Sequence, residues 1–152
     1  MNEFIPAAKP IIGDEERAAV DRVLQSGMVA QGPEVAAFEA EFSAHFVDSR
    51  PVVAVNSGTS GLHLGLLAAG IGPGDEVIVP SFTFAATANS VALTGATPVF
   101  ADIEAETFTL APSAVRSAIT ERTKGIMPVH LYGHPARMAP LAAIADEHGI
   151  AL

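Results

Sequence analysis

The sequence predicts an α/β fold in which a mostly parallel β-sheet is covered by helices on both faces. From residue 51 onward, short apolar runs of strand type alternate with segments of helical periodicity. The runs are apolar throughout, which is typical of strands buried on both faces of a parallel sheet. Each crossover between successive strands is expected to be right-handed.

Two helices are predicted ahead of the sheet. Acidic residues at 14–16 favour a helix start, and Gly27 is suited to end that helix. A second helix is expected to begin at Pro33, because proline is favoured in the first helical turn. We therefore expect an N-terminal helical arm over residues 1–50 and a sheet domain over residues 51–152.

The elements of the sheet domain follow one another along the chain. Strands are expected at 51–56, 76–80, 98–101 and 125–129 and from residue 150, and helices at 57–69, 82–93, from 112 and at 140–148. In such sheets ligands bind beyond the carboxyl ends of the strands. The loops after Asn56, Pro80, Asp102 and Val129 are therefore the expected places for a functional site.

Composition limits the classes of function. The 152 residues suffice for one domain, and the net charge of −9 without a Lys/Arg cluster argues against nucleic-acid and anionic-membrane partners. The chain has no cysteine, which excludes disulfides and thiolate chemistry. No signal peptide is visible, and no apolar stretch approaches the roughly 20 residues that span a bilayer. A soluble cytoplasmic protein is expected.

The first candidate site is the segment Asn56-Ser57-Gly58-Thr59-Ser60-Gly61, which opens the helix after the first predicted strand. Small residues and the free N–H groups of a helix N-terminus favour an anion, and Thr59 and Ser60 add hydroxyl donors. A tight turn with a Ser/Thr cap explains the same residues equally well. The segment matches neither the dinucleotide fingerprint, the P-loop nor the nucleophile elbow.

Two further segments follow predicted strands. Phe82 and Phe84 come after the second strand, where an aromatic ring could lie on a planar ligand, although ordinary core packing is the commoner role. His130, Tyr132 and His134 come after the fourth strand and could act as acid/base groups or ligands, although a loop histidine is more commonly just solvated. Since no other residues show metal-ligand spacing with them, no metal site is expected.

Taken together, these segments resemble the DegT/DnrJ/StrS-type family of pyridoxal-phosphate-dependent sugar aminotransferases. The similarity begins at Ile5-Pro6 and runs along essentially the whole chain, which corresponds to the N-terminal part of the family. The most specific segments are 56–62, 72–78, 80–84, 95–102 and 128–133. So many matches in the same order are far more specific than any one motif.

The resemblance implies the large domain of a fold-type I aminotransferase, truncated, and a homodimer with active sites at the subunit interface. It implies pyridoxal 5′-phosphate (PLP) as cofactor, with Gly58, Thr59 and Ser60 holding its phosphate. Phe84 stands where the family places an aromatic residue against the pyridine ring, which acts as an electron sink.

The resemblance assigns no catalytic residue to this chain. The acid that pairs with the pyridine nitrogen and the Schiff-base lysine are expected beyond Leu152, and neither Lys9 nor Lys124 matches the catalytic position. Because that lysine is the nucleophile of transamination, the fragment itself is expected to be inactive.

For the parent protein, the resemblance implies amino transfer from an amino acid, with glutamate as the expected donor, to the keto group of a nucleotide-linked sugar. Polysaccharide or antibiotic sugar biosynthesis would use such a product. One alternative is a sugar dehydratase of the same family, in which histidine replaces the lysine, and another is a non-catalytic regulatory protein on the same scaffold. An unrelated doubly wound nucleotide binder is disfavoured because the phosphate-loop fingerprints are absent.

Overall fold

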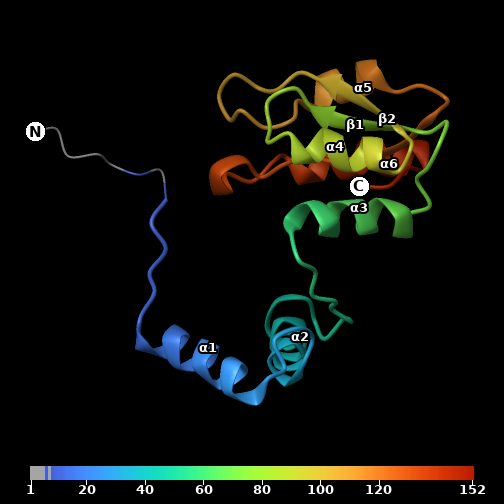
Figure 1. The fold of residues 1–152 in the computed structure, drawn as a ribbon. Helices are drawn as coiled ribbons and strands as arrows, with labels where there is room; N and C mark the ends of the chain where they lie inside the picture. Colours follow the sequence, from blue (N-terminus) through green and yellow to red (C-terminus); the bar gives the residue numbers. More distant parts are fainter. Residues whose placement is uncertain (1–5, 7) are drawn as a thin grey trace, which may run out of the picture. The chain divides into compact units, whose positions relative to one another are not determined.

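The chain divides into two compact units, Met1–Ala54 and Val55–Leu152 (Figure 1). The structure, a computed structural model, describes residue 6 and residues 8–152. Ile5, where the family resemblance begins, and the first residues of the predicted arm lie outside the described residues. Within the described part, no helix combines the length and apolarity needed to cross a bilayer.

The first unit holds the two predicted helices, α1 (Asp14–Ser26) and α2 (Pro33–Phe46). At the start of α1, the Glu16 carboxylate accepts a hydrogen bond of 2.7 Å from the Gly13 amide. Gly27 ends α1 in the left-handed conformation at φ 71°, which glycine adopts without steric cost. Both helix starts and the stop at Gly27 are confirmed.

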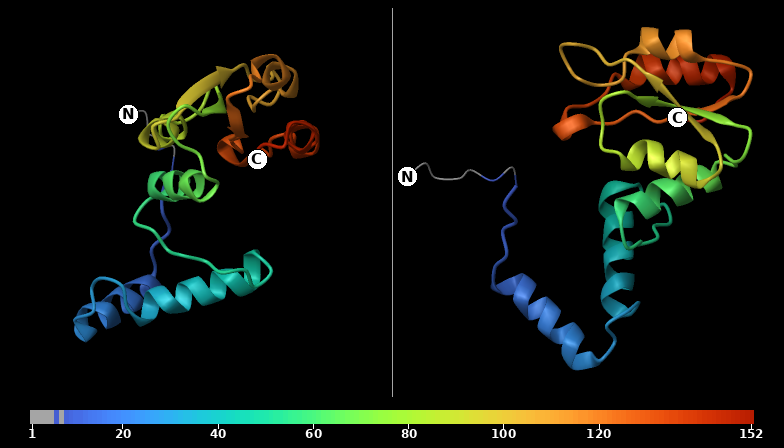
Figure 2. Two further views of the ribbon diagram at one scale, coloured as in Figure 1. Left: turned by 90° about the vertical axis from the view of Figure 1, so that its right-hand side faces the viewer. Right: turned by 45° about the horizontal axis from the view of Figure 1, so that its top comes forward.

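The second unit is built on a parallel sheet of β1 (Glu76–Pro80), β2 (Thr97–Ala101) and β3 (Thr123–Ile126), in the order β2-β1-β3 (Figure 2). The helical elements of this unit are α3 (Gly58–Ala68), α4 (Ala86–Leu93), α5 (Pro112–Ala118), η1 (Leu131–Gly133) and α6 (Met138–His148). The predicted fold class, a parallel sheet alternating with helices, is confirmed.

Side chains of β1 enter two separate hydrophobic cores. Val77 and Val79 pack with Leu66 of α3 and Val91 of α4. Ile78 points to the other face and packs with a cluster that includes residues of α5 and α6. Successive side chains of a strand point to opposite faces, so one central strand requires helices on both sides. The prediction that helices cover both faces is confirmed.

The crossovers follow a single rule of handedness. The chain moves from β1 to β2 through α4 on one face, then reverses direction and reaches β3 through α5 on the other face. Because the face changes together with the direction, the two crossovers have the same hand, as the rule for parallel strands requires.

The strand expected at 51–56 is not formed. Residues 51–56 pair with none of the three strands, which have the order β2-β1-β3. The Ala54 amide, which a strand ladder would use, donates instead to the Glu39 carboxylate at 2.8 Å. Val53 is 76% exposed, so the apolar run gains little burial here. The prediction was wrong because an apolar run forms a strand only where an adjacent strand is available for backbone hydrogen bonds.

Several element boundaries also differ from the prediction; for example, the helix expected from Pro140 begins at Met138. The helix expected from Phe82 begins at Ala86, because the Ser81 amide still donates to the Ala101 carbonyl at 2.8 Å and so extends the β1–β2 pairing. The strand expected at 125–129 is formed at Thr123–Ile126. From residue 150 onward, only an isolated parallel bridge joins Ala151 to Gly125.

A buried acid ties the amino end of β1 to the turn before β3. Glu76 is 6% exposed and accepts hydrogen bonds from the Thr120 hydroxyl at 2.5 Å and from Arg122 Nε at 3.0 Å. The Thr120 hydrogen bond, followed by the Arg122 interaction, holds the pKa of Glu76 below its usual value of 4.5.

We expect Glu76→Gln to flatten the acid side of the stability profile. Since the folded-state pKa is depressed, the carboxylate stabilises the fold fully above about 4.5, and this contribution is lost as pH falls through the folded-state pKa. Chemical denaturation across the acid range, with Glu121→Gln as the control, measures the effect. A stability difference between wild type and Glu76→Gln that stays constant into acid would contradict it.

We expect Ile78→Ala to lower the free energy of unfolding by about 2–5 kcal/mol, because it leaves a cavity at a fully buried position. Leu67→Ala, on the half-exposed side of α3, is the matched control and should cost less than about 1 kcal/mol. An equal decrease in the free energy of unfolding for the two variants would show that burial of Ile78 contributes no more to stability than the half-exposed Leu67.

Candidate functional site

The first two candidate segments lie at the same edge of the sheet. Helix α3 leads through a short turn into the amino end of β1, and its 11 residues span about 16 Å. The five residues of β1 cover about the same length in the opposite direction. The N-terminus of α3 therefore lies at the edge where β1 ends and the 81–85 loop begins (Figure 1).

The N-terminal turn of α3 satisfies some of its donors internally. Ser57 caps the helix, since its Oγ accepts from the Ser60 amide at 3.1 Å and its carbonyl accepts from the Gly61 amide at 3.1 Å. The Ser60 hydroxyl donates to Asn56 Oδ1 at 2.7 Å. The cap predicted from the sequence is thus confirmed.

The cap leaves two donors free for a ligand. The backbone amides of Gly58 and Thr59, the first two of α3, find no acceptor within the described part of the chain. The first turn of α3 contains no acidic residue, and space around Gly58 is open. Two free amides at the positive end of a helix dipole can bind an anion such as phosphate. The Ser57 cap uses the Ser60 amide and leaves the Gly58 and Thr59 amides free, so a capped helix can still bind an anion.

The aromatic loop after β1 presents its rings to solvent. Phe84 is 78% exposed and Phe82 49%, so in this unit neither is an ordinary core residue. The loop is held by a 3.0 Å hydrogen bond between the hydroxyls of Thr83 and Thr87 and by one from the Thr87 amide to the Phe84 carbonyl. An exposed ring on a fixed loop can lie against a planar ligand.

The third candidate segment does not bring His130 together with Tyr132 and His134. His130 Nδ1 accepts a 3.0 Å hydrogen bond from the Ala136 amide, which commits that nitrogen to holding the loop. Tyr132 is 95% exposed, and His134 is exposed as well. Among the described residues, no group of three or more His, Cys, Asp or Glu side chains could hold a metal ion.

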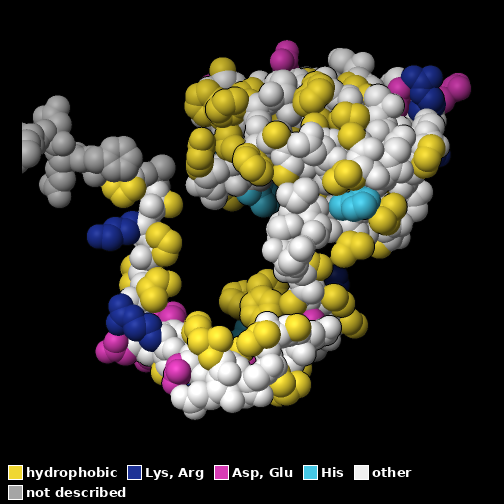
Figure 3. Space-filling view, in the orientation of Figure 1, with side chains coloured by type: hydrophobic (Ala, Val, Ile, Leu, Met, Phe, Trp, Pro, Cys, Tyr) yellow, Lys and Arg dark blue, Asp and Glu magenta, His cyan; other side chains and the backbone are white. Residues whose placement is uncertain are grey.

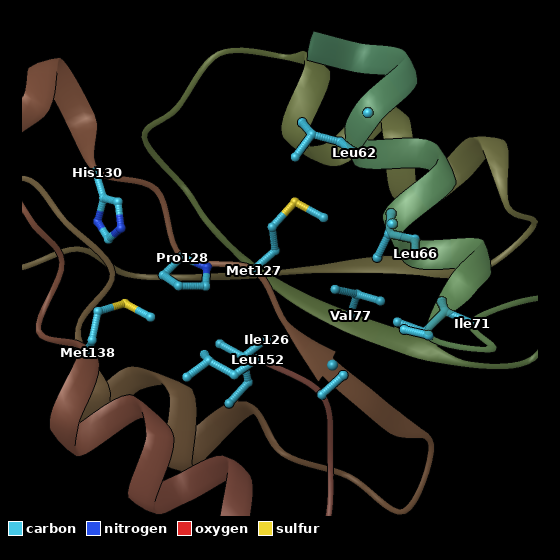
Figure 4. A pocket seen from close by; sticks show the side chains of 15 residues that line it. Leu62, Leu66, Ile71, Val77, Ile126, Met127, Pro128, His130, Met138 and Leu152 are labelled. Atoms are coloured by element: carbon cyan, nitrogen blue, oxygen red, sulfur yellow. The ribbon is translucent and has the colours of Figure 1, made fainter. Parts of the chain in front are cut away.

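An apolar cavity of about 440 Å³, which the sequence does not predict, lies between α3 and the β3 side of the sheet (Figure 4). Leu62 and Leu66 line it from α3, and Met127, Met138 and Leu152 line it from the opposite side. Its only titratable lining residue within the described part is His130. Because few polar groups converge there to orient a ligand, the cavity carries no catalytic assignment. Its lining comes from segments far apart in sequence, so no local motif could reveal it.

Fold and site together define an α/β protein with two free amides at a helix N-terminus and an exposed aromatic loop at the carboxyl edge of a parallel sheet. A family model described as the DegT/DnrJ/EryC1/StrS aminotransferase family matches residues 10–152. The chain belongs to this family, and the resemblance predicted from the sequence is confirmed.

Similar proteins agree with the assignment. The chain is 48% identical over 149 residues to the spore coat polysaccharide biosynthesis protein SpsC of Bacillus subtilis (strain 168), covering 98% of this chain and 38% of SpsC. The structure of S. venezuelae DesV in complex with a ketimine intermediate matches with a TM-score of 0.85 and 51% identity, over 90% of this chain and 37% of DesV. NtdA from Bacillus subtilis, solved with its cofactor PMP, matches with a TM-score of 0.86 and 37% identity, over 98% of this chain and 36% of NtdA. The chain thus spans less than two fifths of these relatives.

We expect Ser57→Ala to destabilise the second unit by about 1 kcal/mol, because the Ser60 amide loses its acceptor. Ser57→Gly should cost only a few tenths of a kcal/mol, since glycine is tolerated at an N-cap. Chemical denaturation of the three chains measures both losses. If the alanine variant matched wild type, the Ser57 hydrogen bond would not stabilise α3.

Proposed function

We propose that the chain is the cofactor-phosphate-binding part of a PLP-dependent aminotransferase that transfers an amino group to a keto-sugar nucleotide. The observation that carries this proposal is the pair of free amides, Gly58 and Thr59, at the N-terminus of α3 in a chain of this family. Residues 1–50 form the N-terminal arm, and residues 51–152 form the first part of the PLP-binding large domain.

The residues present fit the cofactor. The amides of Gly58 and Thr59, with the Thr59 and Ser60 hydroxyls, bind the cofactor phosphate, and the exposed ring of Phe84 supports its pyridine ring. When bound, PLP supplies an electron sink for the reacting amino carbon. The chain's own part is to hold and orient that group.

We propose that the catalytic groups lie beyond Leu152 and that this chain alone does not turn over. Lys124 is the second residue of β3, towards its amino end, whereas the proposed phosphate site at residues 58–60, which we call the phosphate turn, lies at the carboxyl edge. It therefore does not match a Schiff-base lysine, which must reach the cofactor aldehyde.

The substrates and assembly are part of the same proposal. The amino donor is glutamate, the acceptor is a nucleotide-linked keto sugar, and the longer protein is a cytoplasmic homodimer. The role of SpsC in spore coat polysaccharide biosynthesis supports a product used in polysaccharide or antibiotic sugar biosynthesis. Family membership supports the use of an amino donor and a sugar acceptor.

Inorganic phosphate should shift the amide NMR signals of Gly58 and Thr59, because these are the free donors at the site. Thr59→Asp should weaken phosphate binding about tenfold or more, because the new carboxylate places negative charge at the anion site. The helix itself should remain stable, since an acidic side chain is favourable at a helix N-terminus. Thr97→Asp makes the same charge change at the amino end of β2 and serves as the control.

In the longer protein, the same Thr59→Asp change should weaken PLP binding, while Thr97→Asp should leave it unchanged. Amino transfer from glutamate to a keto-sugar nucleotide is then assayed with the wild-type longer protein. Unchanged Gly58 and Thr59 signals in phosphate would contradict the phosphate site, and failure of every keto-sugar nucleotide as acceptor would contradict the proposed reaction.

A further inference from the structure

Two loops meet beyond the carboxyl ends of β2 and β3, outside the phosphate turn. One is a hairpin over residues 103–110, closed by an antiparallel bridge between Ile103 and Leu110. The other runs over residues 130–137 and contains η1. A salt bridge of 2.9 Å from Arg137 Nη1 to Glu104 Oε1 joins them. Hydrophobic side chains gather over this edge of the sheet (Figure 3).

A cavity of about 260 Å³ lies between these loops. Its lining residues are Glu106, Thr107 and Phe108 from the hairpin and Leu131, Tyr132 and His134 from the second loop. Tyr132 is 95% exposed and Phe108 53%. We call this cavity the hairpin pocket. Its walls combine aromatic faces with a carboxylate, a hydroxyl and an imidazole.

Both aromatic residues of the hairpin pocket are held in an unusual backbone conformation. Phe108 has φ 56° and Tyr132 has φ 51°, in the left-handed region that bulky residues rarely adopt. The Phe108 amide donates to the Glu104 carbonyl at 2.8 Å, and the Gly133 amide donates to the His130 carbonyl at 3.1 Å. Backbone conformations of this kind cluster at ligand sites, where the surrounding structure maintains them.

The hairpin pocket is continuous with the aromatic loop of the candidate site. The rings of Phe108 and Phe82 lie 6.1 Å apart at an interplanar angle of 56°. Phe82 is two residues before Phe84, the proposed support of the cofactor ring. A ligand whose reacting end lies near Phe84 could therefore place its far end over Phe108 and Tyr132.

We propose that the hairpin pocket is a stacking site for the nucleobase of the nucleotide-sugar substrate; this inference rests on the proposed function. A volume below the roughly 300–1,000 Å³ typical of ligand sites suits one ring system and not a whole nucleotide sugar. The lining has one acid and no lysine or arginine, so it favours a neutral base over a diphosphate.

The aromatic and the polar side chains of the hairpin pocket are proposed to contact different parts of the base. Aromatic side chains bind bases by stacking, and polar groups beside them read hydrogen-bonding positions on the base edge. Phe108 and Tyr132 supply the stacking surfaces, and Glu106 and His134 line the pocket beside them, while the Thr107 hydroxyl is engaged with Glu104 and Thr109 within the hairpin.

Tyr132 offers a direct reporter, because it is the single tyrosine of the sequence. Fluorotyrosine incorporated into this chain gives one fluorine NMR signal. Uridine and thymidine monophosphates should shift that signal saturably, and ribose phosphate and glucose should not. If neither nucleotide changes the fluorine chemical shift, the proposal is overturned. It is also overturned if only glucose changes that shift. A signal that depends only on protein concentration indicates self-association and overturns it too.

Kinetics of the longer protein provide the second test. Tyr132→Ala should raise KM for the nucleotide sugar about tenfold with little change in kcat, because loss of a base-stacking ring weakens binding. Tyr132→Phe keeps the ring and should stay within about twofold of wild type. Phe100→Ala, which removes an exposed aromatic ring of β2 outside the pocket, is the control. An equal rise in KM for Phe100→Ala, or a loss confined to kcat in Tyr132→Ala, contradicts the proposal.

The two proposals fail separately. If nucleotides shift the Tyr132 signal but the longer protein transfers no amino group, the reaction is wrong and the base site stands. If amino transfer proceeds with a normal KM in Tyr132→Ala, the base site is wrong and the reaction stands.

Discussion

Burial of both faces of β1 is the constraint on which the second unit depends. Val77, Ile78 and Val79 are each at most 1% exposed, although they point alternately to opposite sides. Neither core can form unless helices cover its side of the sheet, so α3 and α4 must cover one face and α5 and α6 the other. The same requirement sets the direction of α3. A helix that packs beside β1 and then leads into it brings its N-terminus to the carboxyl edge of the sheet.

The candidate site is therefore a consequence of the packing. The free amides of Gly58 and Thr59 reach the carboxyl edge because α3 runs opposite to β1, and Phe84 reaches it because β1 ends there. Core residues place these groups without contributing to their chemistry. The polar hydrogen bonds around Ser57 then fix which amides remain available.

Much of this arrangement could be predicted from local patterns. The apolar run at β1 predicts a buried strand, and the small residues at 57–60 predict a helix N-terminus. Each prediction depends on only a few neighbouring positions. The run at 51–56 carries the same kind of signal, yet it forms no strand, because a strand also needs a partner and the Ala54 amide is taken by Glu39. The start of α4 was misplaced because the Ser81 amide continues the pairing with β2. The hairpin pocket depends on a backbone conformation at Phe108 and Tyr132 and on a salt bridge across 33 positions, and no sequence pattern specifies either.

The Glu76 interaction has a consequence for how this fold can diversify. Its contacts with Thr120 and Arg122 lie at the amino end of β1, whereas the N-terminus of α3, the aromatic loop and the hairpin lie at the opposite edge. The Glu76 contacts and the candidate binding loops therefore lie at opposite edges of the sheet. Loops at the carboxyl edge can be lengthened, shortened or exchanged while the contacts at the amino edge stay unchanged, so related chains can vary these loops without rebuilding the core.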